Sequence, residues 1–534
     1  MFKIPTTRWI ANAAARFSGR HGAVTHQAHQ VHCSRQSIYD HAQKVQAAVA
    51  AEYSGGPSRE QLLQENQALR AENAQLWNWL AVTIEFPLVV QQQFSAVALG
   101  MGLSLTQIGI LLALLLGAKA APARSTIHRW AQAAGVAAGR VLRRIDAQCK
   151  ALMLVGCLDE IFFHGRPVLV AVEPASMVWF IGTRAQALRG STWEKQLRAW
   201  DALRYVVADA GVALQAGIAL EQKRRLQEGG QPLDSSLDVF HTKREAHQAL
   251  TIDWNAVERL CKVFDQAEAQ RLKDQQQGID ARPAAQKATR AWAQVVQSFQ
   301  HYEAIEAAWK QAERALAVFR PDGQLNDRTW AQAQVAAALP ALVGRAWGRV
   351  RNHLQNPKSF SFLDRMHNQL AQLPMAQELR EALVHLWWLR RQRPRQAVVG
   401  PVGGAGHVAY LVQQEICQKL DPNWRVWYRD VAAVLRGVVR ASSAVECMNS
   451  VLRMHQARHR TITPGMLDLK RLYWNTRVFR GGQRKGKCPY EHLGLKLASS
   501  DFWDLLEEEM AAALKEAKTV AKVKVKPKSQ AQAS

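Results

Sequence analysis

LMLVGCLDEIFFHGRPVLVAVEPASMVWFIG, residues 152–182, contains three apolar segments, rich in β-branched and aromatic residues and separated by turn residues. This pattern predicts three adjacent strands joined by short turns. RYVVADAG at 204–211 has the same character, and LDVFH at 237–241 is a candidate fifth strand. Because a helical segment separates the third and fourth runs, we expect an α/β domain with a mixed five-stranded sheet.

Acidic residues end two of these predicted strands. Asp159 follows the first apolar run and Asp209 follows the fourth. Carboxylates at strand ends can converge at one edge of a sheet, where ligand sites gather in open α/β sheets. Their oxygens are the ligands that Mg²⁺ prefers, and a pair of divalent ions supports in-line displacement at phosphorus. We therefore predict that Asp159 and Asp209 are catalytic metal ligands.

Two ions need a third carboxylate, and Glu446 is the candidate. It lies in ASSAVECMNSVLRMHQARHR, residues 441–460, which reads as a helix capped by a serine at its start. Asn449, Ser450 and Arg453 follow Glu446 by three, four and seven residues, so they share its face of the helix. A carboxylate beside groups that bind phosphate suits a site that cuts DNA.

Other acids can fill these positions. Glu160 replaces Asp159 if the strand register slips by one residue. Asp201 or Asp238 can replace Asp209, although Asp238 is better placed to cap a helix that starts near His241. His241 can position water or phosphate, or it can be a packed or capping histidine.

The chain is strongly basic. Its 534 residues include 69 Lys and Arg against 44 Asp and Glu, a formal charge of +25. Such an excess indicates a polyanionic partner, with nucleic acid the first candidate. The lysine-rich C-terminal tail supplies only part of it. Residues 436–487 contain twelve Lys or Arg and two acids. This density favours phosphate contact over a solvated face, and the predicted DNA contacts there are Arg440, Asn449, Arg453, Arg458 and Arg460.

Cysteine usage points to a reducing cytoplasm. The seven cysteines form no CxxC pair and are irregularly spaced, which argues against a disulfide framework and a cysteine-based zinc site. The N-terminus lacks the apolar run of a signal peptide. The longest apolar stretch, residues 108–116, is too short to span a bilayer and reads as a buried helix.

Two segments before the sheet have a helix-turn-helix pattern. Residues 8–48 read as three short helices, the last capped by Ser34. In the second segment, SLTQIGILLALLLGA at 104–118 is followed by a turn and by a helix that Gly135 is expected to end, with a further helix after it. Either can be an ordinary packing unit. If they bind DNA, the residues that face the groove are Arg35, Gln36 and Tyr39 in the first, and Arg124, Ser125, Thr126 and Arg129 in the second.

A short leucine-zipper pattern lies between them. Leu62, Leu69 and Leu76 repeat every seven residues, and Asn66, Asn73 and Leu80 occupy the complementary row. Asn at such positions fixes register and favours a parallel dimer. The run covers only about three heptads, so the alternative is one amphipathic helix docked on its own chain.

These segments resemble bacterial insertion-sequence transposases of the DDE type, which have a ribonuclease-H-like catalytic fold. The resemblance rests on an ordered set of segments covering roughly 150–245 and 436–495, a third of the chain: VGCLDEIFFHGRP, YVVADAG, LDVFHTKRE, RASSAVECMNSVLR and NTRVFRGGQRKGKCPYEHLG. It implies that Asp159, Asp209 and Glu446 form the catalytic triad. The 237 residues between Asp209 and Glu446 depart from integrase-like members and resemble members with a helical insertion.

The resemblance further implies two Mg²⁺ or Mn²⁺ ions, double-stranded DNA as partner (terminal inverted repeats and target), and a homodimer or larger assembly. It also implies a bacterial cytoplasm, with the protein associated with the nucleoid. The expected activity is strand cleavage and strand transfer. The alternatives are a non-enzymatic helix-turn-helix regulator and a ribonuclease-H-like nuclease that cuts without joining.

The expected organisation has seven segments. They are a helix-turn-helix at 1–50, a short coiled coil at 57–82, a second helix-turn-helix at 95–148, the first catalytic part at 150–245, an all-α insertion at 246–435, the second catalytic part at 436–495, and a C-terminal helix with a disordered tail at 496–534.

Overall fold

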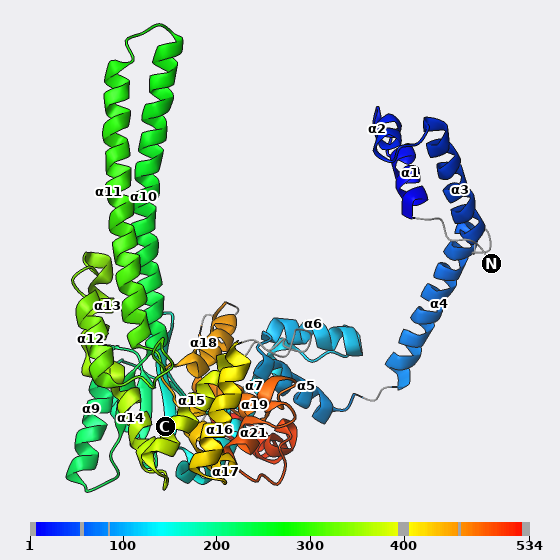
Figure 1. Cartoon of the computed structure of the whole chain (residues 1–534). Coiled ribbons are helices and arrows are strands. Elements are labelled where there is room, and N and C mark those ends of the chain that lie inside the picture. The colour runs from blue at the N-terminus through cyan, green and yellow to red at the C-terminus, as the bar shows by residue number, and fades with distance from the viewer. Residues whose placement is uncertain (1–6, 54–57, 84–85, 393–404, 458–460, 526–534) are drawn as a thin grey trace, which may run out of the picture. The chain divides into compact units, whose positions relative to one another are not determined.

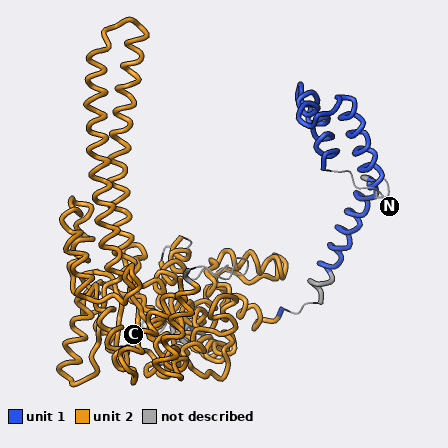
Figure 2. The backbone as a smooth tube through the Cα atoms, viewed as in Figure 1, with its two compact units in different colours: residues 1–86 blue, residues 87–534 orange. Residues whose placement is uncertain are grey.

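A computed structural model describes residues 7–53, 58–83, 86–392, 405–457 and 461–525. The chain divides into two compact units, Met1–Phe86 and Pro87–Ser534 (Figure 2).

Residues 7–53 and 58–83 of the first unit form four helices, and the first three pack together. Ile38 is fully buried among them, and Asn12 joins them through hydrogen bonds with Gln27 and His41. The Ser34 hydroxyl accepts a hydrogen bond from the Ser37 amide at 3.1 Å, so the predicted cap is confirmed. The helices are α1 (Thr7–Phe17), α2 (Ala23–Gln30), α3 (Arg35–Tyr53) and α4 (Arg59–Thr83).

The second unit contains the predicted sheet. Its order is β3-β2-β1-β4-β5. The β1, β2 and β3 strands are antiparallel, whereas β4 runs parallel to both β1 and β5. A mixed five-stranded sheet is therefore confirmed. The strands are β1 (Val155–Phe163), β2 (Arg166–Val172), β3 (Trp179–Arg184), β4 (Tyr205–Ala208) and β5 (Asp234–Leu237).

The fifth strand differs from the prediction. It ends at Leu237, and a helix begins at Val239. The reason lies in Asp238, whose carboxylate accepts a hydrogen bond from the Phe240 amide at 2.7 Å. A capping aspartate outweighs the β propensity of the Val-Phe pair that follows it.

Helices cover both faces of the sheet. One face packs against α18 (Ser443–Gln456), which buries Val445, Met448 and Leu452 against alternate residues of β1 and β2. On the other face, the indole of Trp193 in α8 (Gly190–Leu197) donates to Glu160 of β1, and α9 (Val212–Gln227) packs on α8.

The helix that follows the second predicted turn does not end at Gly135. It continues as α7 (Arg124–Cys149). A Cβ at Gly135 would lie 2.8 to 2.9 Å from the backbone of Gly465 in α19 (Pro464–Thr476). Gly135 is thus a close-approach residue and not a helix stop. The remaining helices here are α5 (Leu88–Met101), α20 (Pro489–Leu493) and α21 (Phe502–Val525).

The apolar stretch at 108–116 forms most of α6 (Leu105–Leu116), which starts with a capping box at Ser104. The prediction of a buried helix is wrong for half of it. Ile108 and Leu112 are fully buried, whereas Ile110 and Leu114 are 57% and 76% exposed, because α6 packs through only one face. None of the helices in the described ranges combines the length and apolarity needed to cross a membrane.

The segment between β5 and α18 is helical and has its own core, around Trp309, Trp347 and Leu383. Its first two helices form a long antiparallel hairpin that extends from the rest of the unit (Figure 1). Trp254 and Trp292 on this hairpin are 39% and 52% exposed, so not every tryptophan of the segment is core. The helices are α10 (Val239–Gln276), α11 (Arg282–Ala315), α12 (Arg328–Ala338), α13 (Gly348–Gln355), α14 (Ser361–Ala371), α15 (Gln377–Gln392), α16 (Ala405–Leu420) and α17 (Trp424–Arg436).

An acid lies half-buried where α7 meets α19. Burial, helped by Asp146, raises the pKa of Asp468 to about 6, although Arg471 and Arg143 oppose the rise. The unfolded pKa is about 4. Above pH 6 the folded chain therefore holds a poorly hydrated charge that unfolding returns to water, which lowers stability. Below the unfolded pKa both states are protonated, and this cost vanishes.

Asp468→Asn should therefore stabilise this unit by roughly 1 to 2 kcal/mol at pH 8. The gain should shrink as the pH falls from 6 towards 4. Thermal unfolding at pH 8 and pH 5 measures it, with the exposed Asp265 on α10 changed to Asn as the control. A gain of equal size at both pH values would contradict the explanation.

Candidate metal centre

Strand pairing brings two of the predicted acids together. Leu158 of β1 pairs with Ala208 of β4. Asp159 and Asp209 directly follow these two paired residues in the sequence. The expectation that Asp159 ends its strand is wrong. It lies in the middle of β1, which continues to Phe163 with β2 as its pairing partner. Asp159 still lies beside the end of β4, because Leu158 pairs with Ala208, the last residue of β4.

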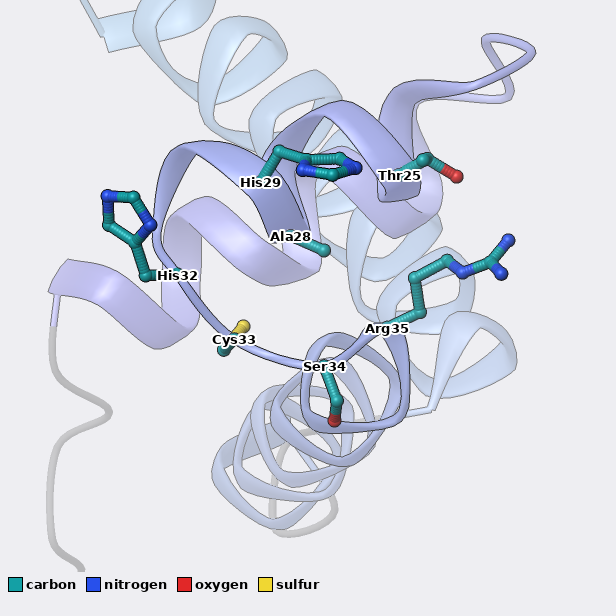
Figure 3. Close-up of a pocket in the computed structure, with 7 residues that line it drawn as sticks. All are labelled: Thr25, Ala28, His29, His32, Cys33, Ser34 and Arg35. Atoms are coloured by element: carbon teal, nitrogen blue, oxygen red, sulfur yellow. The ribbon is translucent and has the colours of Figure 1, made fainter.

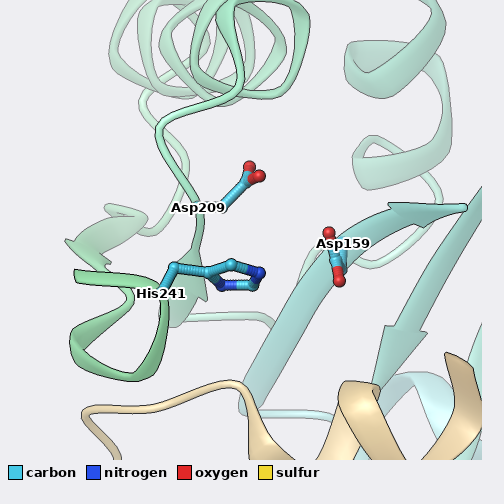
Figure 4. Close-up of side chains that lie close together, drawn as sticks. All are labelled: Asp159, Asp209 and His241. Atoms are coloured by element: carbon cyan, nitrogen blue, oxygen red, sulfur yellow. The ribbon is translucent and has the colours of Figure 1, made fainter. Parts of the chain in front are cut away.

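His241 completes a cluster with these two acids. It lies in the first turn of α10 and is 7% exposed. Each of the three residues offers one atom that could bind a metal, and these three atoms lie within 4.8 Å of one another. Figure 4 shows the three side chains directed at a common point from β1, from the end of β4 and from α10. No pattern in the sequence marked His241 as a ligand, although the helix-capping aspartate three residues earlier is a usable signal.

The capping aspartate also orients the histidine. Asp238 Oδ2 lies 2.6 Å from His241 Nδ1, which leaves Nε2 directed at the centre. Asp238 further accepts hydrogen bonds from the Ser442 amide at 3.1 Å and from the Ser442 hydroxyl. These bonds join the end of β5 to the segment that begins α18, although 204 residues separate them. A carboxylate that fixes the ring of a ligating histidine is a common arrangement in metal sites.

Glu446 lies on the other side of His241. Its Oε1 is 3.4 Å from His241 Nε2 and 3.7 Å from Arg244 Nη1, and its Oε2 is 3.5 Å from Arg453 Nη1. The structure therefore brings Asp159 and Asp209 together with His241, and places the predicted third ligand beyond the histidine. The charge of Glu446 still acts on Asp159, whose pKa it raises.

Asn449 contacts the cluster from the same face of α18. It is fully buried, and its side-chain amide donates to Asp159 Oδ2 at 2.6 Å. Within the described ranges, Asn449 Oδ1 is a buried oxygen that accepts no hydrogen bond, and the buried Glu446 Oε1 has only its ion pairs with His241 and Arg244. Unsatisfied buried acceptors are rare in folded proteins, and oxygen atoms are the ligands of Mg²⁺ and Mn²⁺. The residues present therefore fit a divalent cation.

The protonation equilibria show how closely these charges are packed. Burial raises the pKa of Asp159 to about 6. Burial lowers the pKa of His241, but Asp238 and Glu446 more than compensate and raise it to about 10. The same histidine holds the pKa of Glu446 below its ordinary value. The protonated His241 thus supplies a positive charge among acids where a cation would otherwise bind.

The alternative ligands lie elsewhere. Glu160 accepts a hydrogen bond from Trp193 Nε1 at 2.6 Å on the opposite face of β1, and burial raises its pKa to about 7. Asp201 is exposed and lies 3.4 Å from Arg224. Asp238 caps α10, as predicted.

The arginines predicted to contact phosphate near Glu446 differ in their surroundings. Arg453 is 55% exposed beside Glu446, whereas Arg440 donates to the carbonyl of Leu316. Arg458 and Arg460 lie outside the described residues. Arg440 also lines a cleft of about 1440 Å³, whose lining in the described part of the chain has six arginines, four aromatic residues and no acid. These are Arg314, Arg320, Arg390, Arg391, Arg436, Arg440, Phe319, Trp387, Trp388 and Tyr428.

The two helix-turn-helix candidates expose their predicted residues. In the first, Arg35 and Gln36 are exposed at the start of α3 and Tyr39 is 43% exposed. Arg35 also lines a hollow of about 530 Å³ with Thr25 and His29 (Figure 3). In the second, seven residues separate α6 from α7, more than the usual three or four. Its α7 exposes Arg124, Ser125 and Arg129, and half-buries Thr126.

Comparisons with models of protein families, with curated proteins and with solved structures gave no match for this chain. The candidate function therefore rests on the geometry of the centre and on the charge around it.

Proposed function

We propose that this protein is a DNA transposase of the DDE type, which cleaves DNA strands and transfers their 3′ ends with the help of Mg²⁺ or Mn²⁺. The observation that carries the proposal is the convergence of Asp159, Asp209 and His241 beside the Glu446 carboxylate and the unsatisfied Asn449 Oδ1 of α18, in a chain with a charge of +25. The strand order β3-β2-β1-β4-β5, antiparallel on one side of β1 and parallel on the other, supports a ribonuclease-H-like fold.

Asp159 and Asp209 would hold the ions, with His241 and Glu446 as neighbouring ligands. Divalent ions bound there would activate a water or a 3′-hydroxyl and stabilise the leaving oxygen. The chain's own residues do the rest. Asn449 holds the Asp159 carboxylate in place at 2.6 Å, and Asp238 fixes the His241 ring. Arg453 lies where it can neutralise a phosphate beside Glu446.

Basic surfaces in both units suit a polyanion. The arginine-lined cleft combines guanidinium groups, which bind phosphate, with aromatic rings, which stack on bases. The exposed first turns of α3 and α7 are candidates for duplex recognition. We propose double-stranded DNA, namely element ends and target, as the partner.

The full-length protein tests this directly. Incubated with Mn²⁺ and a supercoiled plasmid that carries the DNA flanking its coding sequence, it should nick the plasmid and join the new 3′ ends to a second DNA. EDTA should abolish both steps. Cleavage that persists in EDTA, or no cleavage with Mg²⁺ or Mn²⁺, would overturn the proposal.

A second candidate is a DNA-binding protein without catalysis, which the arginine-lined cleft and the exposed helix-turn-helix residues favour. It predicts tight, salt-sensitive DNA binding in EDTA and no cleavage. A nuclease without joining activity would give nicked plasmid but no transferred strands.

A further inference from the structure

The α4 helix exposes an apolar stripe. Its described side chains, from Glu60 to Asn78, are all exposed. Leu62, Leu69 and Leu76, one per heptad, are 50% to 53% exposed. Exposed leucines at a seven-residue interval are costly in water and are typical of a helix whose partner is a second helix.

We propose that α4 forms a parallel, in-register, two-stranded coiled coil with α4 of a second copy of this chain. This inference goes beyond the proposed function and does not depend on it, since it rests on α4 alone. Leu62, Leu69 and Leu76 occupy one seam position of the heptad, and Asn66 and Asn73 occupy the other.

The charges that flank the seam select the orientation. Glu65 and Glu72 lie on one flank and Arg70 lies on the other. In a parallel pair, a residue of the first flank meets the residue five positions later on the opposite flank of the partner. Glu65 therefore meets Arg70 of the partner subunit, twice by symmetry. In an antiparallel pair each flank meets itself, and glutamates would face glutamates.

The asparagines select the register. In a parallel, in-register pair Asn66 meets the partner's Asn66, and Asn73 meets the partner's Asn73, so each amide finds another amide. A shift by one heptad leaves one asparagine of each chain without an amide partner, and a buried polar group without a partner is costly. Leu63 and Trp77, on the same flank as Arg70, are 53% and 66% exposed and widen the apolar seam.

The parallel arrangement has a consequence for the three-helix unit of α1 to α3. Because this unit directly precedes α4, both copies lie at the same end of the coil. Two helix-turn-helix candidates held at one end can read two half-sites of a symmetric DNA sequence, which a single copy cannot.

Light scattering of the full-length protein measures its mass as the concentration rises. A range of about 1 to 100 μM covers the dissociation constants expected for a short coiled coil. We expect a concentration-dependent dimer. Leu69→Glu should abolish this step, whereas Leu226→Glu, which changes an 84% exposed leucine on α9, should not. A wild-type chain that stays monomeric throughout, or an association that L69E leaves unchanged, would overturn the proposal.

The orientation is tested separately with the charge pair. E65R and R70E homodimers each carry repelling flanks and should be roughly tenfold weaker than the wild type. Mixing the two variants restores both attractive pairs in a parallel heterodimer, and wild-type affinity should return. If the mixture associates no better than either variant alone, the parallel register is wrong.

Crosslinking gives the register directly. Under mild oxidation L62C should crosslink to L62C and L76C to L76C, as located by mass spectrometry of the linked peptides. A mixture that gives mainly links between L62C and L76C would indicate an antiparallel pair and refute the proposal. None of these measurements uses the metal centre, so a failure of the cleavage test leaves their outcome unchanged.

Discussion

Changing Asp159 to Asn should slow metal-dependent DNA cleavage by roughly a hundredfold to a thousandfold, the scale on which removal of one charge-stabilising group slows an enzyme. Asn keeps the shape of the side chain but removes the charge that would hold the ion. Its amide can still pair with Asn449, which now donates to Asp159 at 2.6 Å. We expect calorimetric Mn²⁺ binding to be lost together with cleavage.

Stability provides the internal check on this variant. Burial raises the pKa of Asp159 to about 6, so its charge at pH 8 is a cost in the metal-free protein. Without metal, D159N should therefore melt at the same temperature as the wild type or higher. A large drop in melting temperature would mean that the lost activity reflects unfolding.

Glu160→Gln is the matched control, since it changes the neighbouring carboxylate, which Trp193 binds on the opposite face of β1. Gln keeps an oxygen for that indole, so cleavage should stay within a few-fold of wild type. If E160Q is inactive and D159N is active, the assignment of the two neighbours is reversed.

The largest effect on stability is expected at Gly217, in the middle of α9. An added Cβ would lie 2.3 Å from Trp193 Cβ and 2.8 Å from the carbonyl oxygen of Gly190, so one of the two helices must move. Overpacking of this kind costs about 3 kcal/mol. The better helix propensity of Ala returns at most about 1 kcal/mol. Gly217→Ala should therefore lower the urea midpoint and the melting temperature of this unit.

The same change should weaken the metal centre. Gln215 of α9 donates from Nε2 to the carbonyl oxygen of Asp209 at 2.7 Å, so a displaced α9 moves Asp209. Gly348→Ala, at the start of α13 with nothing within 4 Å of the added carbon, is the control and should leave stability and Mn²⁺ affinity unchanged or slightly improved. If G217A unfolds like the wild type, the packing of α8 on α9 is looser than described.

The sheet was predictable because its signals are local. Apolar runs of strand length, separated by turn residues, define β1 to β4. The end of β5 was missed because Val239 and Phe240 favour a strand by composition, whereas the side chain of Asp238 starts a helix. Gly135 was misread because the residue that requires its missing side chain, Gly465, is 330 positions away.

The two aspartates of the centre were predictable from the sequence, whereas the histidine was not. Asp159 and Asp209 follow paired strand residues, so their proximity follows from the pairing of β1 with β4. Glu446 and His241 meet because the segment before α18 binds the residues that start α10, through bonds from Ser442 to Asp238. No spacing in the sequence encodes that contact. The sequence therefore pointed to a carboxylate on α18 but not to the histidine between it and the aspartates.

The bonds between Asp238 and Ser442 also constrain how the chain folds. On a ribosome that adds about 5 to 20 residues per second, the 204 residues between them take about 10 to 40 seconds to appear. During that interval the β1 and β2 face that α18 later buries stays open, and the Asp238 carboxylate lacks two of its donors. Such long-range closure is slow and exposes apolar surface to aggregation. Translation that stops within the helical segment should leave a chain that has its sheet but no assembled centre.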